Sequence, residues 1–314
     1  MARASRVHSI RSASYAAGCL LTCWTALSPA LAAENTSCRE LERQFNLTRT
    51  DIVSVQLNSA LFSAADAGCE EFARRLLAAG AALEARDRLG AMPLAHAART
   101  GQRALVELFL AKGAPIDARA LSGSTALYVA AESERPATVA SLLAKNADPN
   151  LPGRSGVTPL AAAAFKGNDR IVEQLLSHNA DPDIVDRTGK AAMTYAAARG
   201  FAEIVRRLLG AGVDAGRRYG NDLTALMWAA GHEDGVGFRA AENVINQLLD
   251  AGAPIDAADD RGRTALMIAA ERGHGEVVAM LIGRGADQNL RDKGGKTALD
   301  LAADTNVRRT LMIR

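Results

Sequence analysis

The sequence predicts an all-α fold in which short pairs of helices stack side by side into a solenoid. Three observations lead to this prediction: segments of similar sequence recur at a constant spacing, apolar residues within each segment follow the helical period, and a glycine or asparagine closes each segment. Aromatic residues make up only 4% of the chain, and alanine is abundant. Small side chains let helices approach closely, as stacked helix pairs require.

The segment 259–291 is the clearest of the repeated units. Thr264 precedes its first helix, where a side-chain oxygen can cap the free backbone N–H groups. Leu266 is followed at i+3 and i+4 by an alanine pair, which defines one apolar face. Gly285 ends the second helix, because glycine adopts the positive φ of a C-terminal cap. Such a unit cannot bury its apolar face alone and therefore requires neighbours.

The neighbouring units are present along the chain. The step between equivalent apolar positions is 33 residues throughout, except for one step of 40 residues between Leu226 and Leu266. An alanine pair follows each of these positions, which are Leu61, Leu94, Leu127, Leu160, Met193, Leu226, Leu266 and Leu299. The predicted ends of the second helices are Gly80, Gly113, Asn146, Asn179, Gly212, Gly252 and Gly285. We therefore expect seven to eight units over residues 59–314, with a seven-residue insertion inside 231–241.

On these residues the chain resembles the ankyrin-repeat family, whose unit contains the motifs Thr-Pro-Leu-His, Gly-His and Leu-Leu at fixed offsets. The strongest matches are Gly156–Leu160 and Gly262–Gly273, and the resemblance covers about residues 55–314. It implies an ankyrin-repeat solenoid with projecting loops that binds protein rather than catalysing a reaction. One departure is systematic, because the histidine after the leucine is absent; its places hold Phe62, Ala95, Tyr128, Ala161, Thr194, Met227, Met267 and Asp300.

Residues 1–33 have the three-part pattern of a signal peptide. Arginines occur early in the segment, an apolar run follows over about Tyr15–Leu27, and Ala30-Leu31-Ala32 provides small residues for cleavage after about Ala32 or Ala33. The apolar run is shorter than the ~20 residues that a membrane span requires. We therefore expect an exported protein without a membrane span after signal removal, located in the periplasm or, second, outside the cell.

Two cysteines remain after the predicted cleavage, Cys38 and Cys69. An even pair in an exported protein favours a disulfide bond, although two unrelated small residues would give the same count. The bond would join an N-terminal capping segment, residues 34–58, to the first helix pair. Ser37 and Glu40 have the spacing of a capping box, which predicts a helix start at Ser37.

Charge and motif content argue against several functions. Residues 1–33 contain three arginines and no acid, so of 37 basic and 35 acidic residues the remaining chain keeps 34 and 35. A basic field for nucleic acid is therefore absent. No phosphate-binding loop, nucleophile elbow or zinc-protease motif occurs. We expect no enzyme activity, no cofactor and no metal site, although His232, Glu233 and Asp234 in the insertion leave an enzymatic alternative open.

The expected activity is protein binding, by a monomer, through the loops and first helices of units five to seven. Insertions in a stack map to one face, which is often the binding face, and Trp, Tyr and Arg are enriched in interfaces. The candidate contact residues are Tyr128, Arg187, Lys190, Tyr195, Arg218, Met227, Trp228, Arg261, Arg263 and Met267. For Trp228, a role in filling space beside the insertion is the alternative. The favoured function is a scaffold of the cell envelope that modulates a partner protein; the alternative is a secreted effector that binds host proteins.

Overall fold

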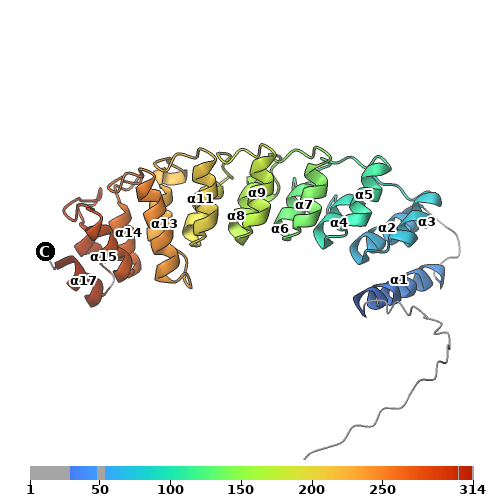
Figure 1. The fold of residues 1–314 in the computed structure, drawn as a ribbon, viewed down its shortest axis with the longest axis horizontal. Coiled ribbons are helices and arrows are strands. Elements are labelled where there is room, and N and C mark those ends of the chain that lie inside the picture. Colours follow the sequence, from blue (N-terminus) through green and yellow to red (C-terminus); the bar gives the residue numbers. More distant parts are fainter. Residues whose placement is uncertain (1–28, 48–53, 303, 313–314) are drawn as a thin grey trace, which may run out of the picture.

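The computed structural model describes residues 29–47, 54–302 and 304–312 of the chain. The predicted signal peptide falls mainly on residues 1–28, which lie outside the described residues. The all-α prediction is confirmed, since the described part of the chain contains 17 α-helices, two short 3-10 turns and no strand. The helices stand side by side and form a curved, elongated arc (Figure 1).

After the N-terminal helix α1 (Pro29–Leu47), the helices alternate between two layers. The inner layer contains the first helix of each unit: α2 (Ser54–Ala67), α4 (Pro93–Thr100), α6 (Ala126–Glu132), α8 (Pro159–Lys166), α10 (Ala192–Ala198), α12 (Ala225–Ala230), α14 (Ala265–Arg272) and α16 (Ala298–Leu301). The outer layer contains the second helices: α3 (Glu70–Ala78), α5 (Arg103–Ala111), α7 (Pro136–Leu143), α9 (Asp169–Ser177), α11 (Ala202–Gly210), α13 (Phe238–Asp250), α15 (Gly275–Gly283) and α17 (Thr305–Met312).

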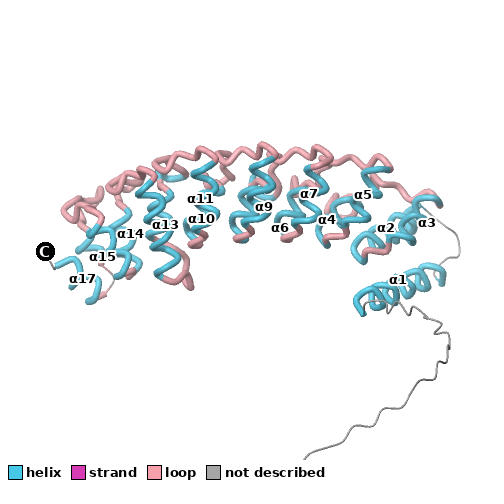
Figure 2. Tube along the Cα trace, in the orientation of Figure 1, coloured by secondary structure: helices cyan, strands magenta, loops and turns pink. Residues whose placement is uncertain are grey.

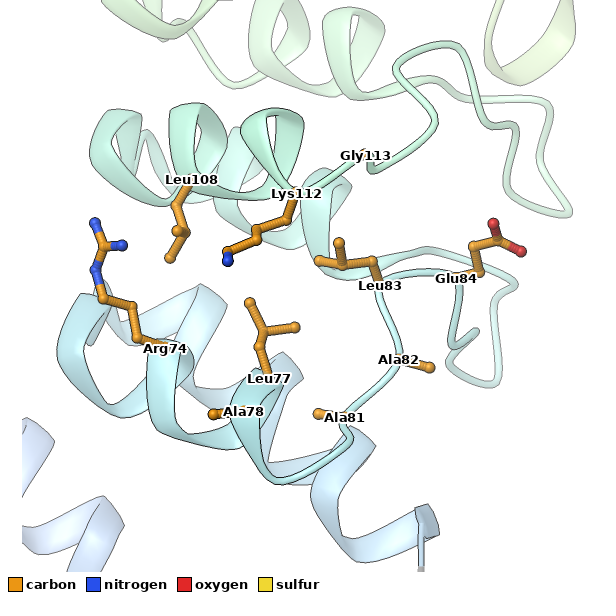
Figure 3. A pocket seen from close by; sticks show the side chains of 10 residues that line it. All are labelled: Arg74, Leu77, Ala78, Ala81, Ala82, Leu83, Glu84, Leu108, Lys112 and Gly113. Atoms are coloured by element: carbon orange, nitrogen blue, oxygen red, sulfur yellow. The ribbon is translucent and has the colours of Figure 1, made fainter.

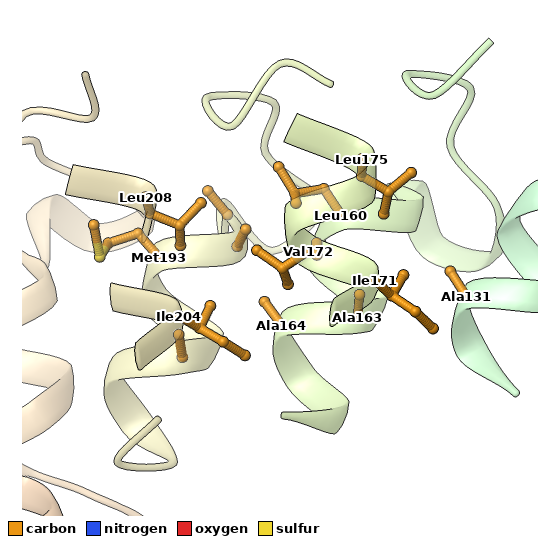
Figure 4. Close-up of a cluster of buried hydrophobic side chains, with 14 of the residues drawn as sticks. Ala131, Leu160, Ala163, Ala164, Ile171, Val172, Leu175, Met193, Ile204 and Leu208 are labelled. Atoms are coloured by element: carbon orange, nitrogen blue, oxygen red, sulfur yellow. The ribbon is translucent and has the colours of Figure 1, made fainter. Parts of the chain in front are cut away.

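The core is a continuous layer of small and branched side chains between neighbouring helix pairs (Figure 4). In α8, Leu160 is 1% exposed and the alanine pair Ala163 and Ala164 is fully buried. The inner helix α8 packs on both α6 and α10, so these side chains fill the joints between units. Burial of one leucine side chain is worth about 1.5–3 kcal/mol. Each unit therefore gains its stability from contact with the units before and after it.

The long connections between units run together along one edge of the arc, and the short turns inside units lie along the opposite edge (Figure 2). The predicted left-handed ends of the outer helices are present, including the two that lack glycine: Asn146 and Asn179 have φ of 61° and 62°. Asp222, which replaces a glycine found in other long connections, also adopts a positive φ of 58°.

Each long connection is held by hydrogen bonds that do not need the absent histidine. Asp186 Oδ1, for example, accepts the backbone N–H groups of Thr188 and Lys190, and Asp87, Asp259 and Asp292 bind their own loops in the same way. Neighbouring loops are joined by backbone bonds, as in Leu121 N–H to Leu89 O at 2.9 Å. These bonds order the loops along the edge.

The predicted threonine cap is confirmed. Thr264 Oγ1 accepts the backbone N–H of Met267 at 3.3 Å, and Thr125, Thr158, Thr224 and Thr297 cap their helices in the same way. In α10 the roles are reversed, because Ala191 takes the capping position and the hydroxyl of Thr194 bonds both backbone groups of Ala191. Thr194 stands at one of the places of the absent histidine.

The N-terminal helix α1 covers the first unit, and Cys38 and Cys69 form the disulfide bond that the sequence favoured, with an S–S distance of 2.01 Å. Phe45 packs edge-on against Phe72, with ring centroids 5.7 Å apart. The predicted helix start at Ser37 is wrong, because α1 begins earlier, at Pro29, and Ser37 lies within it. The even pair of cysteines thus predicted the contact of this helix, whereas the capping pattern did not locate its first residue.

The insertion is divided between a turn and a helix. The turn between α12 and α13 spans residues 231–237, and α13 has 13 residues where α11 and α15 have nine. The additional turn of helix makes α13 extend beyond its neighbours at the edge of the short turns (Figure 2). The sequence predicted an enlarged turn only; its final residues, from Phe238 onward, are helical.

The disulfide predicts a redox dependence of stability. The bond closes a sequence separation of 31 residues, and a loop of that length is worth about 3 kcal/mol in the chain-entropy account. Reduction, or Cys38→Ser, should lower the free energy of unfolding by about that amount. Urea denaturation with and without reductant measures the difference, and mass spectrometry of unreduced digests should recover the two cysteine peptides as one cross-linked species. Separate thiol peptides from the oxidised protein would contradict the assignment.

Candidate functional site

The inner helices carry two adjacent rows of side chains that differ in exposure. From α6 to α14, the residues directly after the unit leucine face the core: Met227 and Met267 are 2% and 1% exposed. The next residues along the chain are half-buried and present a surface, among them Tyr195 and Trp228. Met227 and Met267, two of the candidate contact residues, are therefore part of the core and present almost no surface to a partner. The second row, not the place of the absent histidine, forms the face of the inner helices.

Tyr128 belongs to the buried row but reaches a cavity with its hydroxyl. The residue is 3% exposed, and its ring lies against Gly153, where an added Cβ would stand 2.6 Å from ring atoms. Its hydroxyl donates to Glu132 at 3.2 Å. Burial first, and the neighbouring carboxylate second, raise the pKa of Tyr128 to about 12, so the phenol stays protonated and acts as a donor.

Three aromatic side chains from consecutive units form a row on the inner helices: Phe165 of α8, Tyr195 of α10 and Trp228 of α12. The rings of Phe165 and Tyr195 meet edge to face, with centroids 5.7 Å apart. The ammonium group of Lys190 lies 5.7 Å from the centroid of Tyr195 and 4.8 Å from that of Trp228. These are cation–π distances. The candidate residues Lys190, Tyr195 and Trp228 thus form one cluster, which we call the aromatic row together with Phe165.

The position of Tyr195 is set by a buried carboxylate. Its hydroxyl donates to Asp186, which is 7% exposed and belongs to the preceding loop. Burial opposes the charge of Asp186, but hydrogen bonds from Tyr195, Thr188 and the backbone of Lys190 outweigh it and lower its pKa. Burial and the same carboxylate raise the pKa of Tyr195. The loop that contains Asp186 is therefore joined to the aromatic row by a hydrogen bond.

A cavity of about 280 Å³ opens beside the aromatic row. Tyr128, Val157, Phe165 and Tyr195 provide its apolar walls, and the remaining lining residues are Glu132, Arg154, Ser155, Ala162 and Lys166. Phe165 is 38% exposed, which is unusual for so large an apolar side chain. The arrangement suits a ligand whose apolar group enters between the rings while its polar groups remain outside the cavity.

Four basic residues near the aromatic row lack an ion pair within the described residues: Arg154, Lys166, Arg187 and Lys190. The other basic candidates are engaged. Arg218 donates to the backbone oxygens of Asp222 and Ala258, Arg261 pairs with Asp259 at 3.4 Å, and Arg263 pairs with Glu271. Arg218 therefore joins two neighbouring loops. Of the four cations without an ion pair, Arg154 and Lys166 line the cavity, and Lys190 lies over the rings of Tyr195 and Trp228.

The insertion is fastened to the units on either side of it. The backbone N–H of Glu233 donates to Ala198 O at 3.0 Å, and its carboxylate lies 3.5 Å from Arg199. The guanidinium of Arg199 stacks on Phe165 at 4.5 Å from the ring centroid. On the other side, the rings of His232 and His274 stack in parallel, 3.8 Å apart. The insertion thus connects the aromatic row to the next unit.

Comparison with protein families matches the family of ankyrin repeats (3 copies) over residues 61–153, 94–186, 160–238 and 238–312. The chain belongs to the ankyrin-repeat family. Among solved structures, the human ASB11 ankyrin repeat domain is similar with a TM-score of 0.63 and 26% sequence identity, over 70% of this chain and 96% of that one. No curated protein matched the chain. The ankyrin-repeat fold generally serves protein–protein interaction.

Sequence reasoning on the ankyrin repeats missed Phe165 and Lys166. They lie at the end of a first helix, five and six residues after Leu160, whereas the candidates on first helices lie one or two residues after the unit position and the others lie in the loops. Aromatic residues on the surface of an alanine-rich stack are the signal that would have found Phe165, because the chain contains only 7 phenylalanines. The side chain of Phe165 is exposed because of its rotational position on α8, and that position follows from where the helix begins and ends.

Other features of the ankyrin stack are weaker candidates. An outer trough of about 620 Å³ lies between α3 and α5, where Leu77, Leu83 and Leu108 meet Lys112 and Arg74 (Figure 3). Arg74 is already paired with Glu70. Among the described residues, no group of three or more His, Cys, Asp or Glu side chains is placed to hold a metal, and no helix is long and apolar enough to cross a membrane.

A partly buried histidine joins the first two ankyrin units. His96 lies 3.0 Å from Asp66 through Nδ1 and 3.1 Å from Asp87 through Nε2. Burial opposes its charge, but Asp66 and Asp87 together outweigh burial and raise the pKa of His96. Burial also opposes the charge of Asp87, yet hydrogen bonds from Ala91, Leu89 and His96 lower its pKa. Both pKa shifts favour the state in which His96 is protonated and Asp87 is ionised.

These shifts predict a pH dependence of stability. Because the folded pKa of His96 is raised, its contribution is fully present below the ordinary value of about 6.5 and is lost as pH rises through the folded value. The contribution of Asp87 is lost as pH falls below about 3.8. His96→Asn should cost about 1–2 kcal/mol near pH 6 and less at pH 9. Urea denaturation across this range measures it; an equal loss at both pH values would contradict the contact.

Proposed function

We propose that the protein is an exported, non-catalytic, monomeric scaffold of the cell envelope, resident in the periplasm, which binds and modulates a partner protein through the aromatic row. The observation that carries the proposal is the convergence of Phe165, Tyr195 and Trp228 with four unpaired cations on one surface of an ankyrin stack. Aromatic side chains supply most of the energy in protein interfaces, and unpaired cations steer and orient a partner.

Placement in the envelope is supported by residues 1–33 and by the disulfide. Residues 1–33 have the pattern of a signal peptide, and a disulfide bond between Cys38 and Cys69 is stable in an oxidising compartment rather than in a reducing one. At the cavity, Glu132 accepts a hydrogen bond from Tyr128, and beside it Asp186 accepts bonds from Tyr195 and from its own loop.

Binding predicts that the aromatic row controls capture of the partner. Lys190→Glu combined with Trp228→Ala should reduce recovery of co-purifying envelope protein by about tenfold or more, since one hot-spot residue contributes about 2 kcal/mol. The matched control is Arg170→Glu, because Arg170 is also exposed and without an ion pair but lies on outer helix α9. Circular dichroism checks that each variant is folded. Equal capture by the double variant and wild type would remove the aromatic row from the interface.

Export predicts a processed chain in the envelope. Cell fractionation followed by N-terminal sequencing should find the protein in the periplasmic fraction, beginning near residue 33 or 34. Recovery mainly from the culture medium would instead favour a secreted effector. An unprocessed chain in the cytoplasm would contradict both forms of the proposal.

A further inference from the structure

The cavity beside the aromatic row limits which part of a partner can bind there. Its walls combine two phenols, the exposed ring of Phe165 and the side chain of Val157, and two unpaired cations, Arg154 and Lys166, stand at its rim. The volume of about 280 Å³ accommodates one large apolar side chain rather than a whole element of secondary structure. A bound segment must therefore present a single apolar side chain.

The charges around the cavity are not evenly distributed. Glu132 and Arg154 line it next to Tyr128, so that end is nearly neutral. Lys166 lies at the end of α8, and Arg187 and Lys190 belong to the long connection between α9 and α10. Of the three acids of that connection, Asp186 is buried and accepts bonds from Tyr195 and Thr188, Asp183 pairs with Arg217, and Asp181 accepts the backbone N–H of Asp183. The side toward α10 and α12 is therefore positive.

We propose that the aromatic row binds an extended acidic segment of the partner that carries one large apolar side chain. The apolar side chain occupies the cavity between Phe165 and Tyr128, and carboxylates of the segment lie along Lys166, Arg187 and Lys190. The segment is extended because the charged groups come from the end of an inner helix and from the next loop, so consecutive contacts are spread across units. This inference rests on the proposed function and specifies the chemistry of its ligand.

A single-stranded nucleic acid is the competing ligand for an aromatic and cationic surface, because bases stack on rings and phosphates pair with cations. Its backbone carries a phosphate at every nucleotide, so one phosphate would stand near the carboxylate of Glu132 at the cavity. A peptide can place its apolar residue there and its acids elsewhere. The position of Glu132 therefore favours the peptide.

Three labelled peptides of twelve residues test the inference against the full chain by fluorescence anisotropy. The first has a central Phe flanked by Asp and Glu, the second has Ala in place of Phe, and the third has Lys in place of every acid. The first should show saturable binding at or below about 1 mM. The second should bind about tenfold more weakly or worse, and the third should not saturate, because its charges oppose the surface.

Variants of the chain locate the site. Phe165→Ala should weaken the first peptide by about tenfold, and Lys166→Glu should weaken it and reduce its salt dependence. Both side chains are exposed, so neither substitution removes a core contact. Arg170→Glu, in the same unit on the outer layer, should stay within about twofold of wild type, since it is distant from the peptide.

Several results would overturn the inference. These are no saturation by the first peptide, equal binding of the Phe and Ala peptides, a loss with Arg170→Glu as large as with Lys166→Glu, or tighter binding of a ten-residue thymidine oligonucleotide than of the first peptide. If partner capture still depended on Lys190 and Trp228 in that case, the scaffold proposal would stand and only the ligand chemistry would be wrong.

Discussion

Contact between neighbouring helix pairs is the interaction on which the rest of the structure depends. A helix of six to nine residues is too short to be stable alone in water, and the inner helices α4 to α14 all lie in that range. Their alanine pairs and leucines are buried only because another unit covers them. Each unit must present the same face to the next, and this is why equivalent residues recur at a regular step of 33 residues in the sequence.

This requirement leaves two parts of each unit free to vary. The second residue after the unit leucine is only partly buried in most units, and its type varies: it is His96 in one unit and Tyr195 or Trp228 in others. The loops vary as well, although hydrogen bonds from their aspartates and between neighbouring loops maintain their shape. Arg218 shows that a basic loop residue can be structural. A functional surface must therefore be sought among side chains that neither fill a joint nor join two loops, and Phe165, Lys166 and Lys190 meet that condition.

Most of the fold could be predicted from sequence because it repeats. The period, the alanine pairs and the positive-φ residues each recur several times, so Asn146 and Asn179 were recognised as helix ends from position alone. Individual features were harder. Helix α1 begins at Pro29, upstream of the capping pattern at Ser37, so this pattern alone did not mark the helix start. Met267 is buried and its neighbour Ile268 is only partly buried, although they are adjacent in the same helix. Because both residues are apolar, the periodicity of apolar residues does not show which of the two faces the core.

The central claim is that each ankyrin unit derives its stability from its neighbours, and native-state amide hydrogen exchange tests it most directly. Units with two neighbours should exchange most slowly, so protection should be highest in α6, α8 and α10 and should decrease toward α16 and α17, which have a neighbour on one side only. The disulfide should keep α2 and α3 better protected than α16 and α17. Equal protection of all helices, with exchange only through complete unfolding, would instead indicate a single cooperative core and would contradict the account.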